Sequence, residues 1–170
     1  MNSFLKSIGL CESCRIEVDI NRSELIQRLW KITYKTNTTF ISLEKDSAIP
    51  TRFEYRGMIK ENSFIIKRRT RLFDINMNNS VFHGHISDEN GKSSISVEVR
   101  PSEFQIFNRI VILCFCLVVV FANIEEDKQD FMFVAIASII AFSQYFILKR
   151  GVSRGKYEFE RELVYIVQKP

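Results

Sequence analysis

The most charged stretch of the chain is basic, and its spacing suits contact with an anion: Lys67-Arg68-Arg69-Thr70-Arg71. Because successive side chains of a β-strand point to opposite faces, a strand here would place Lys67, Arg69 and Arg71 together. Arg68 would point the other way and would need a partner if that face were buried. The functional interpretation is contact with lipid headgroups or a small anionic ligand, joined from neighbouring strands by Arg52, Arg56 or Arg100. The alternative is a solvated strand face whose charges block edge-to-edge pairing.

Two histidines, His83 and His85, alternate along a predicted strand and therefore share a face. They could act as a base or as metal ligands. With Cys11 and Cys14, which have C-x-x-C spacing, they could complete a set of four zinc ligands. No nucleophile motif, paired carboxylates or glycine-rich phosphate loop accompanies them. We therefore expect ordinary strand residues and reduced cysteines, with no metal, no cofactor, no catalytic residue and no enzymatic activity.

An antiparallel meander is predicted to position these side chains. Segments rich in β-branched and aromatic residues alternate with polar turns, and the strands are expected at 53–59, 63–73, 81–87 and 93–100. The pair Asn90-Gly91 predicts a tight hairpin between the last two strands, because it readily takes positive φ.

The part of the chain before the meander predicts one strand and one helix. Residues 15–20 alternate polar and apolar, which indicates a half-buried strand. Residues 23–30 repeat apolar side chains at helical spacing, with Asn21 or Ser23 as the cap. We expect residues 34–51 to form a loop with one short strand or turn.

The two ends of the chain predict further helical structure. Residues 1–14 form a separate segment, with a short amphipathic helix that could lie on the membrane surface. Residues 157–167 predict a C-terminal amphipathic helix that docks on the sheet. We expect Gly151 and Gly155 to break or loosen the chain before it.

Two apolar runs near the C-terminal end predict a transmembrane helical hairpin over residues 104–150. A spanning helix needs roughly 17–25 mostly apolar residues, and the expected spans are 107–124 and 131–148. Arg109 would lie inside the first span and would reach back to the headgroups. The alternative is a buried helix pair in a soluble protein, but neither run has the polar face of such a helix.

Charges flank the hairpin asymmetrically. The link between the runs is acidic, whereas basic residues lie on the open side: Arg100, Arg109, Lys149, Arg150, Arg154 and Lys156. The positive-inside rule therefore places both termini in the cytoplasm, in a multi-pass protein of the cytoplasmic (inner) membrane. Arg109, Lys149 and Arg150 are the candidate interface residues. A net charge of +4 suits an anionic leaflet and gives no argument for nucleic acid.

The expected fold is an α+β membrane protein: an antiparallel sheet with an N-terminal and a C-terminal helix, and the hairpin inserted before the latter. Residues 15–103 and 155–170 would form the cytoplasmic domain. The element order resembles the helix-grip (START-like) fold, although we count fewer strands. Fold analogy carries no ligand.

Two hairpin segments resemble a family of uncharacterised bacterial membrane proteins. The resemblance lies in Phe53-Glu-Tyr-Arg-Gly-Met-Ile-Lys-Glu-Asn-Ser-Phe-Ile-Ile-Lys-Arg-Arg69 and in Gly84-His-Ile, Asn90-Gly91 and Val99-Arg100-Pro101. In that family similar hairpins precede a two-helix membrane segment. The stretch 72–81 departs from the pattern, which has a more basic and aromatic turn ending in proline. The resemblance implies architecture and no activity.

Three hypotheses for the function follow. The first is a non-enzymatic membrane protein whose cytoplasmic domain binds a protein partner, lipid or a small ligand. The second is a membrane-perturbing effector, in which a sensing domain controls homo-oligomerisation through the hairpin. The third is an accessory or immunity-type subunit of another membrane protein.

Overall fold

The computed structural model describes residues 2–36, 46–69, 80–89, 92–125 and 131–168. A six-stranded sheet has the strand order β1-β6-β5-β4-β3-β2. The strands are β1 (Glu12–Val18), β2 (Thr33–Lys35), β3 (Tyr55–Ile59), β4 (Ser63–Arg68), β5 (Ser80–Glu89) and β6 (Lys92–Pro101). The helices are α1 (Asn2–Ser7), α2 (Arg22–Ile32), the 3-10 turn η1 (Asp46–Ala48), α3 (Glu103–Glu125) and α4 (Phe131–Gln168).

The α+β class and the antiparallel meander from β3 to β6 are confirmed, and β1 closes the order by pairing with β6. The sheet is nevertheless mixed, because β2 pairs in parallel with β3. This strand has three residues and follows α2 directly, with Thr33 as both the helix cap and the first strand residue. Three residues are too few to produce a period of two in the sequence.

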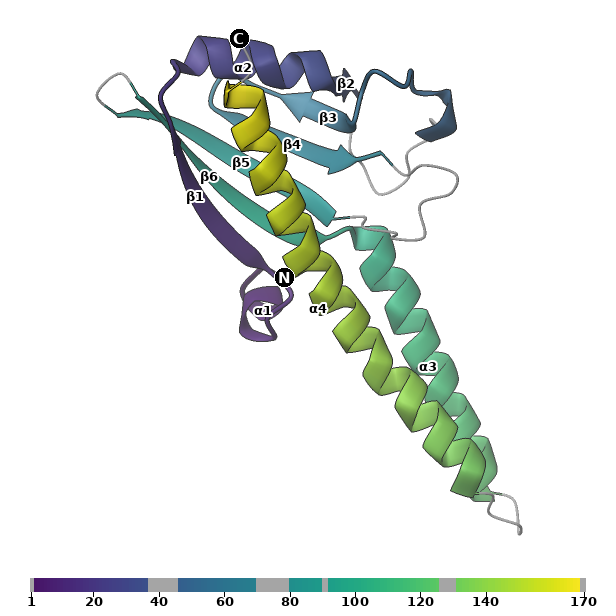
Figure 1. Ribbon diagram of the computed structural model, residues 1–170. Helices are drawn as coiled ribbons and strands as arrows, with labels where there is room; N and C mark the ends of the chain where they lie inside the picture. Colours follow the sequence, from purple (N-terminus) through teal and green to yellow (C-terminus); the bar gives the residue numbers. More distant parts are fainter. Residues whose placement is uncertain (1, 37–45, 70–79, 90–91, 126–130, 169–170) are drawn as a thin grey trace.

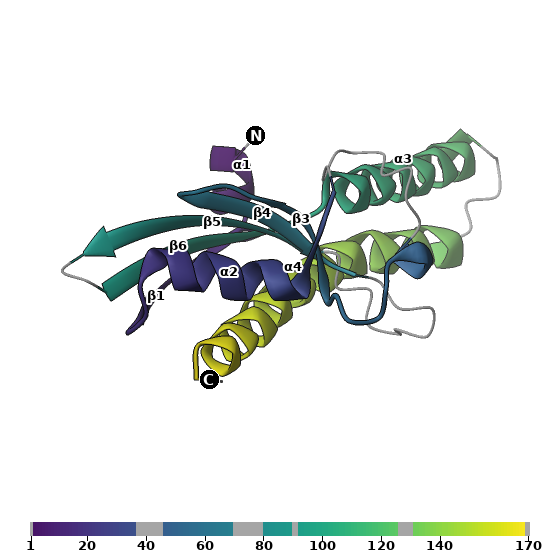
Figure 2. The ribbon, with the colours of Figure 1, turned by 90° about the horizontal axis from the view of Figure 1, so that it is seen from above.

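Helices α2 and α4 cover one face of the curved sheet, here called the inner face, whereas α1 lies on the opposite side (Figures 1 and 2). The inner face holds the core. Its largest fully buried side chains come from the strands, from α2 and from α4: Tyr55, Phe64, Ile66, Ile86, Ile95, Val97, Val99, Leu25, Leu29, Val152, Phe159 and Leu163. The other face is called the outer face.

Helix α4 runs without a break from Phe131 to Gln168. The prediction that Gly151 and Gly155 would interrupt it was wrong. Each glycine inside a helix costs about 1 kcal/mol relative to alanine, but packing against the sheet offsets this cost, since Val152, Phe159 and Leu163 are all buried there. Gly155 is itself buried, and because it has no side chain, α4 has room to pack on the strands there.

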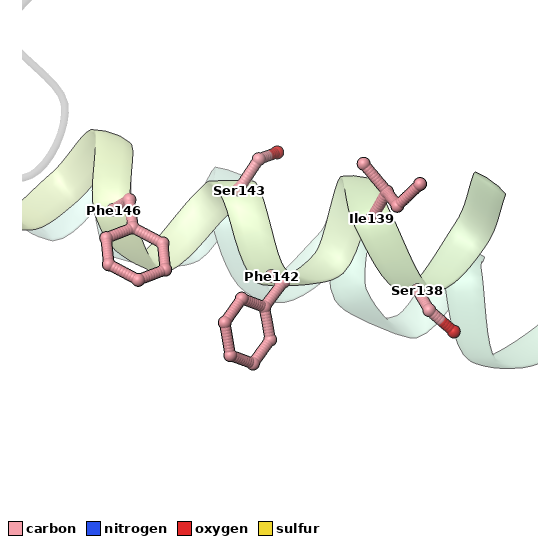
Figure 3. A pocket seen from close by; sticks show the side chains of 5 residues that line it. All are labelled: Ser138, Ile139, Phe142, Ser143 and Phe146. Carbon is pink, nitrogen blue, oxygen red and sulfur yellow. The ribbon is translucent and has the colours of Figure 1, made fainter. Parts of the chain in front are cut away.

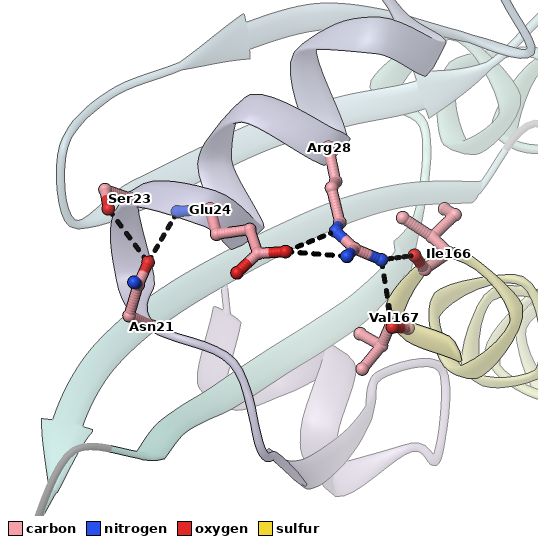
Figure 4. Close-up of polar contacts among 6 residues, drawn as sticks. All are labelled: Asn21, Ser23, Glu24, Arg28, Ile166 and Val167. Atoms are coloured by element: carbon pink, nitrogen blue, oxygen red, sulfur yellow. Dashed lines mark hydrogen bonds and ion pairs between the residues drawn. The ribbon is translucent and has the colours of Figure 1, made fainter. Parts of the chain in front are cut away.

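Helix α2 holds the far end of α4 through an arginine (Figure 4). The Arg28 guanidinium donates to the carbonyl oxygens of Ile166 and Val167 at 2.8 and 2.9 Å. Glu24 accepts from the same guanidinium at 2.6 Å, and Asn21 caps α2 by accepting from the Glu24 amide. The cation therefore satisfies carbonyls that a helix C-terminus leaves open, and it complements the helix dipole.

Helices α3 and α4 lie side by side as an antiparallel pair that leaves the sheet at one end (Figure 1). On α4 the buried residues Ala137, Gln144 and Leu148 recur at intervals of seven and four, which is the spacing of a helix seam. Arg109 of α3 donates to the side-chain oxygen of Gln144. The predicted reach of Arg109 to the headgroups stays a prediction, and the described contact of its guanidinium is with Gln144.

Candidate functional site

The hairpin presents an apolar surface. Both α3 and α4 are long and apolar enough to cross a membrane, and only 6% and 17% of their most apolar windows are buried. Large apolar side chains point outward along both helices, among them Phe104, Phe107, Ile110, Phe115, Val118, Phe121, Ile139, Phe142 and Phe146. A core helix of a soluble domain would bury one stripe of such residues, and these helices leave most of theirs open.

A shallow hollow lies on the outward surface of α4 (Figure 3). It is lined by Ser138, Ile139, Phe142, Ser143 and Phe146. The Ser138 and Ser143 hydroxyls donate to carbonyls of their own helix at 2.8 and 2.7 Å. Their polarity is thus satisfied without a partner helix, so the hollow adds no unmet hydrogen bond to an apolar surface.

Helix α1 docks where the apolar part of α4 ends. Leu5 and Leu10 are buried against Leu148, and the Tyr145 hydroxyl donates to the Ile8 carbonyl at 3.0 Å. Phe4, by contrast, is 63% exposed. The two interface candidates on α4 follow directly, with Lys149 lying 5.8 Å over the Tyr145 ring and Arg150 exposed.

Arg68 lies on the inner face, opposite Lys67 as strand alternation predicted, and it contacts α4. Its guanidinium lies 2.5 Å from a carboxylate oxygen of Glu158 and 3.9 Å from one of Glu162. The buried Tyr55 hydroxyl donates to Glu162. Burial, followed by the charge of Glu162, raises the pKa of Tyr55 well above its usual value, so the phenol stays a neutral donor. The cluster joins the sheet to α4.

Sequence reasoning did not identify Tyr55, Glu158 and Glu162 as partners of Arg68. A signal exists in the sequence: Glu158 and Glu162 lie four residues apart, so they share one side of a helix. That side borders the buried residues Phe159 and Leu163. Carboxylates beside an apolar stripe become partly buried when the stripe packs, so they require cations on the surface that the stripe contacts.

Three other basic residues form a row across the outer face. Register pairs Arg56 with Lys67, Lys67 with Val81, and Val81 with Arg100. The row lies at the end of the sheet next to the hairpin, because β6 ends at Pro101 and α3 begins at Glu103. It brings together the predicted candidates Lys67 and Arg100.

Of the other basic candidates, Arg69 contacts a backbone carbonyl, Arg56 belongs to the row and Arg71 lies outside the described residues. Arg69 donates to the Ile49 carbonyl at 2.6 Å. Arg56, which joins the row, is buried and lies 2.6 Å from Asp46. Arg71 lies outside the described residues.

Lys67 and His83 are half-buried on the outer face, and the side chain of neither makes a hydrogen bond or ion pair with another described residue. Burial, followed by repulsion from Arg56, lowers the pKa of Lys67. Burial, followed by repulsion from Arg100, lowers the pKa of His83. His85 is exposed two residues further along β5. The surroundings of Lys67 and His83 therefore disfavour the charged form of each group.

The two N-terminal cysteines point to different partners. The Cys11 thiol donates to Glu98 at 3.0 Å. Cys14 instead packs against the core cluster on the inner face. Burial is the main cause that raises the pKa of each thiol to about 11, which leaves both protonated at neutral pH.

This separation bears on the metal hypothesis. His83 and His85 lie on the outer face, whereas Cys14 lies on the inner one, so the four predicted ligands do not converge. Within the described ranges, no group of three or more His, Cys, Asp or Glu side chains is placed to hold a metal ion.

The described side chains therefore gather basic groups at one end of the outer face and present an apolar surface along the hairpin. No protein-family model, curated protein or solved structure matches the chain.

Proposed function

We propose that α3 and α4 cross the cytoplasmic membrane as a helical hairpin and hold the sheet as a cytoplasmic, non-enzymatic binding domain. One observation carries the proposal: α4 passes as a single helix from the exposed apolar surface into the core of the sheet. An apolar helix pair of this length with little burial is stabilised by lipid. The domain is then attached through a rigid element.

The orientation follows from the charges at the two ends of the pair. Lys149, Arg150, Arg154 and Lys156 lie on α4 at the sheet end, and Arg100 precedes α3 there. The link at 125–130 carries four acids and one lysine. The positive-inside rule therefore favours the sheet and both termini on the cytoplasmic side.

The outer face is the better candidate for the binding surface. The space between the sheet and α4 is the other place where a ligand could lie. Here the rings of Tyr55, Phe64 and Phe82 pack on Phe159 in that space, with centroid distances of 5.8, 6.1 and 4.5 Å. The half-buried basic groups lie on the other face, which supports an anionic ligand there.

A second candidate function is the membrane-perturbing effector, and the continuity of α4 favours it. A rigid helix would carry a displacement of the sheet directly to the hairpin, and the exposed apolar surfaces could then pair between copies. Loss of membrane potential on expression of the chain would support this candidate. An unchanged potential with and without inducing conditions would leave the anchored binding domain.

Cysteine labelling tests the proposed topology. Two variants are made from a chain whose four native cysteines are replaced by alanine. One has a single cysteine in place of Lys128 in the link, and the other has one in place of Arg161, an exposed residue of α4. A membrane-impermeant maleimide added to intact cells of a bacterial host should label the Lys128→Cys chain and spare the Arg161→Cys chain. Permeabilised cells should label both. Equal labelling before permeabilisation, or recovery of the chain in the soluble fraction, would overturn the topology.

A further inference from the structure

The strongest unassigned feature is the basic row at the hairpin end of the outer face. Lys67 and Arg100 flank Val81 from the neighbouring strands β4 and β6. Adjacent strands lie about 4.8 Å apart, so the two backbones are separated by roughly 10 Å. Both long side chains can reach a group seated over Val81. His83 is the next residue of β5 on the same face.

Among the residues that the structure describes, basic side chains outnumber acidic ones around this point. The Arg56 guanidinium lies 2.6 Å from a carboxylate oxygen of Asp46, and the charge of Asp46 also acts on Lys67. Arg100 and Lys6 lie 3.7 and 3.5 Å from Glu98. Within the described part of the chain, four cations (Arg56, Lys67, Arg100 and Lys6) thus face the carboxylates of Asp46 and Glu98 in a partly dehydrated setting. The Lys67 ammonium makes no hydrogen bond with a described residue, and such an ammonium is stabilised by an anion.

The position of the row, next to the apolar surface of α3, indicates which kind of anion would bind there. Arg100 lies three residues before α3, and Phe104 and Phe107 are exposed in the first turns of that helix. Four residues of chain span at most about 14 Å. The exposed apolar surface of α3 therefore begins close to a phosphate held over Val81. An anionic phospholipid offers both chemistries in one molecule, whereas free phosphate offers only the first.

We propose that Lys67, Arg100 and His83 form a headgroup site for an anionic phospholipid, whose acyl chains lie against the exposed apolar surface of α3. This inference rests on the proposed hairpin and names the ligand of its domain. The lipid headgroup would supply the hydrogen-bond acceptor that Lys67 lacks among the described residues. It would also reduce the repulsion from Arg56 and Arg100, which adds to the main effect of burial in lowering the pKa of Lys67 and of His83.

Native mass spectrometry of the full chain in neutral detergent tests the site. Dioleoylphosphatidylglycerol is titrated against Lys67→Gln, Arg100→Gln and a control, Arg15→Gln. Arg15 is exposed on the same face but pairs with Ser96, four residues along β6 from Arg100. We expect one bound lipid, about tenfold weaker binding in each test variant because a charged hydrogen bond is lost, and no change in the control.

Further measurements distinguish a lipid phosphate from free phosphate and control for misfolding of the variants. Dioleoylphosphatidylcholine, with the same acyl chains, should bind at least tenfold more weakly, and inorganic phosphate should not displace the anionic lipid. Lys67→Arg should retain binding. Equal binding of the two lipids, displacement by phosphate, or an equal loss in Arg15→Gln would overturn the site. Cysteine labelling tests the membrane topology independently of lipid binding, so the proposed topology and the proposed lipid site can each fail without the other.

Discussion

Replacing Phe159 with alanine should lower the free energy of unfolding by about 3–5 kcal/mol, the range for truncating a buried phenylalanine. Phe159 is 2% exposed on α4, and its ring packs on three aromatic rings of the sheet. Urea unfolding in micelles can be followed through Trp30, the one tryptophan, which packs against the same core. The loss should therefore appear as a lower unfolding midpoint.

Tyr157→Ala is the matched control, because Tyr157 lies on the same helix two residues away and is 66% exposed. A surface substitution of this kind is expected to change stability within about 0.5 kcal/mol. If both variants unfolded at the same denaturant concentration, α4 would not be part of the domain core. The claim that the helix joins the hairpin to the sheet would then be wrong.

Replacing Gly57 with alanine should also cost several kcal/mol. Gly57 has a φ of +152°, and an added Cβ would lie 2.1 Å from the Ile65 carbonyl oxygen of the neighbouring strand. Backbone strain of this type costs about 1–3 kcal/mol, and forcing an atom into a packed core costs about 1–3 kcal/mol more. The obstacle is backbone, so no rotamer change relieves it. The same urea titration measures the effect.

Gly151→Ala is the opposite case and serves as the control. An added Cβ there meets nothing within 4 Å, apart from the helix's own neighbouring backbone. Alanine is favoured over glycine inside a helix by about 1 kcal/mol. The variant should be at least as stable as the parent chain. A clear destabilisation would mean that the helix bends or opens at residue 151, contrary to the continuous α4.

The sequence predicted much of the sheet, because local patterns encode it. Alternation identified the strand that became β1, and β-branched and aromatic segments between polar turns identified those that became β3, β5 and β6. Asn21 was one of the two residues expected to cap α2. The boundaries differ by a few residues; β1, for example, begins at Glu12 rather than Arg15. The expected strand at 63–73 is described to Arg68, and the rest lies outside the described residues.

The features that were missed depend on contacts between distant segments. The glycines at 151 and 155 suggest a break by local propensity, and only burial against the sheet overrides them. The parallel pairing of β2 is fixed by β3, which lies about twenty residues later in the chain. Likewise, alternation placed Arg68 on the opposite face from Lys67, but Glu158 as its partner required the fold. The period of the sequence shows which side chains share a face of a strand or helix, whereas tertiary packing determines which residues contact that face.

The central claim is that α4 is one rigid helix from the apolar surface of the hairpin to the core of the sheet. Spin labels at Ile139 and Arg161, both exposed on α4, measure this directly after reconstitution into phospholipid vesicles. An unbroken helix rises 1.5 Å per residue, which predicts a narrow distance distribution centred near roughly 33 Å, plus the reach of the labels. A broad distribution, or a centre many ångströms shorter, would show a break between the two positions and contradict the account.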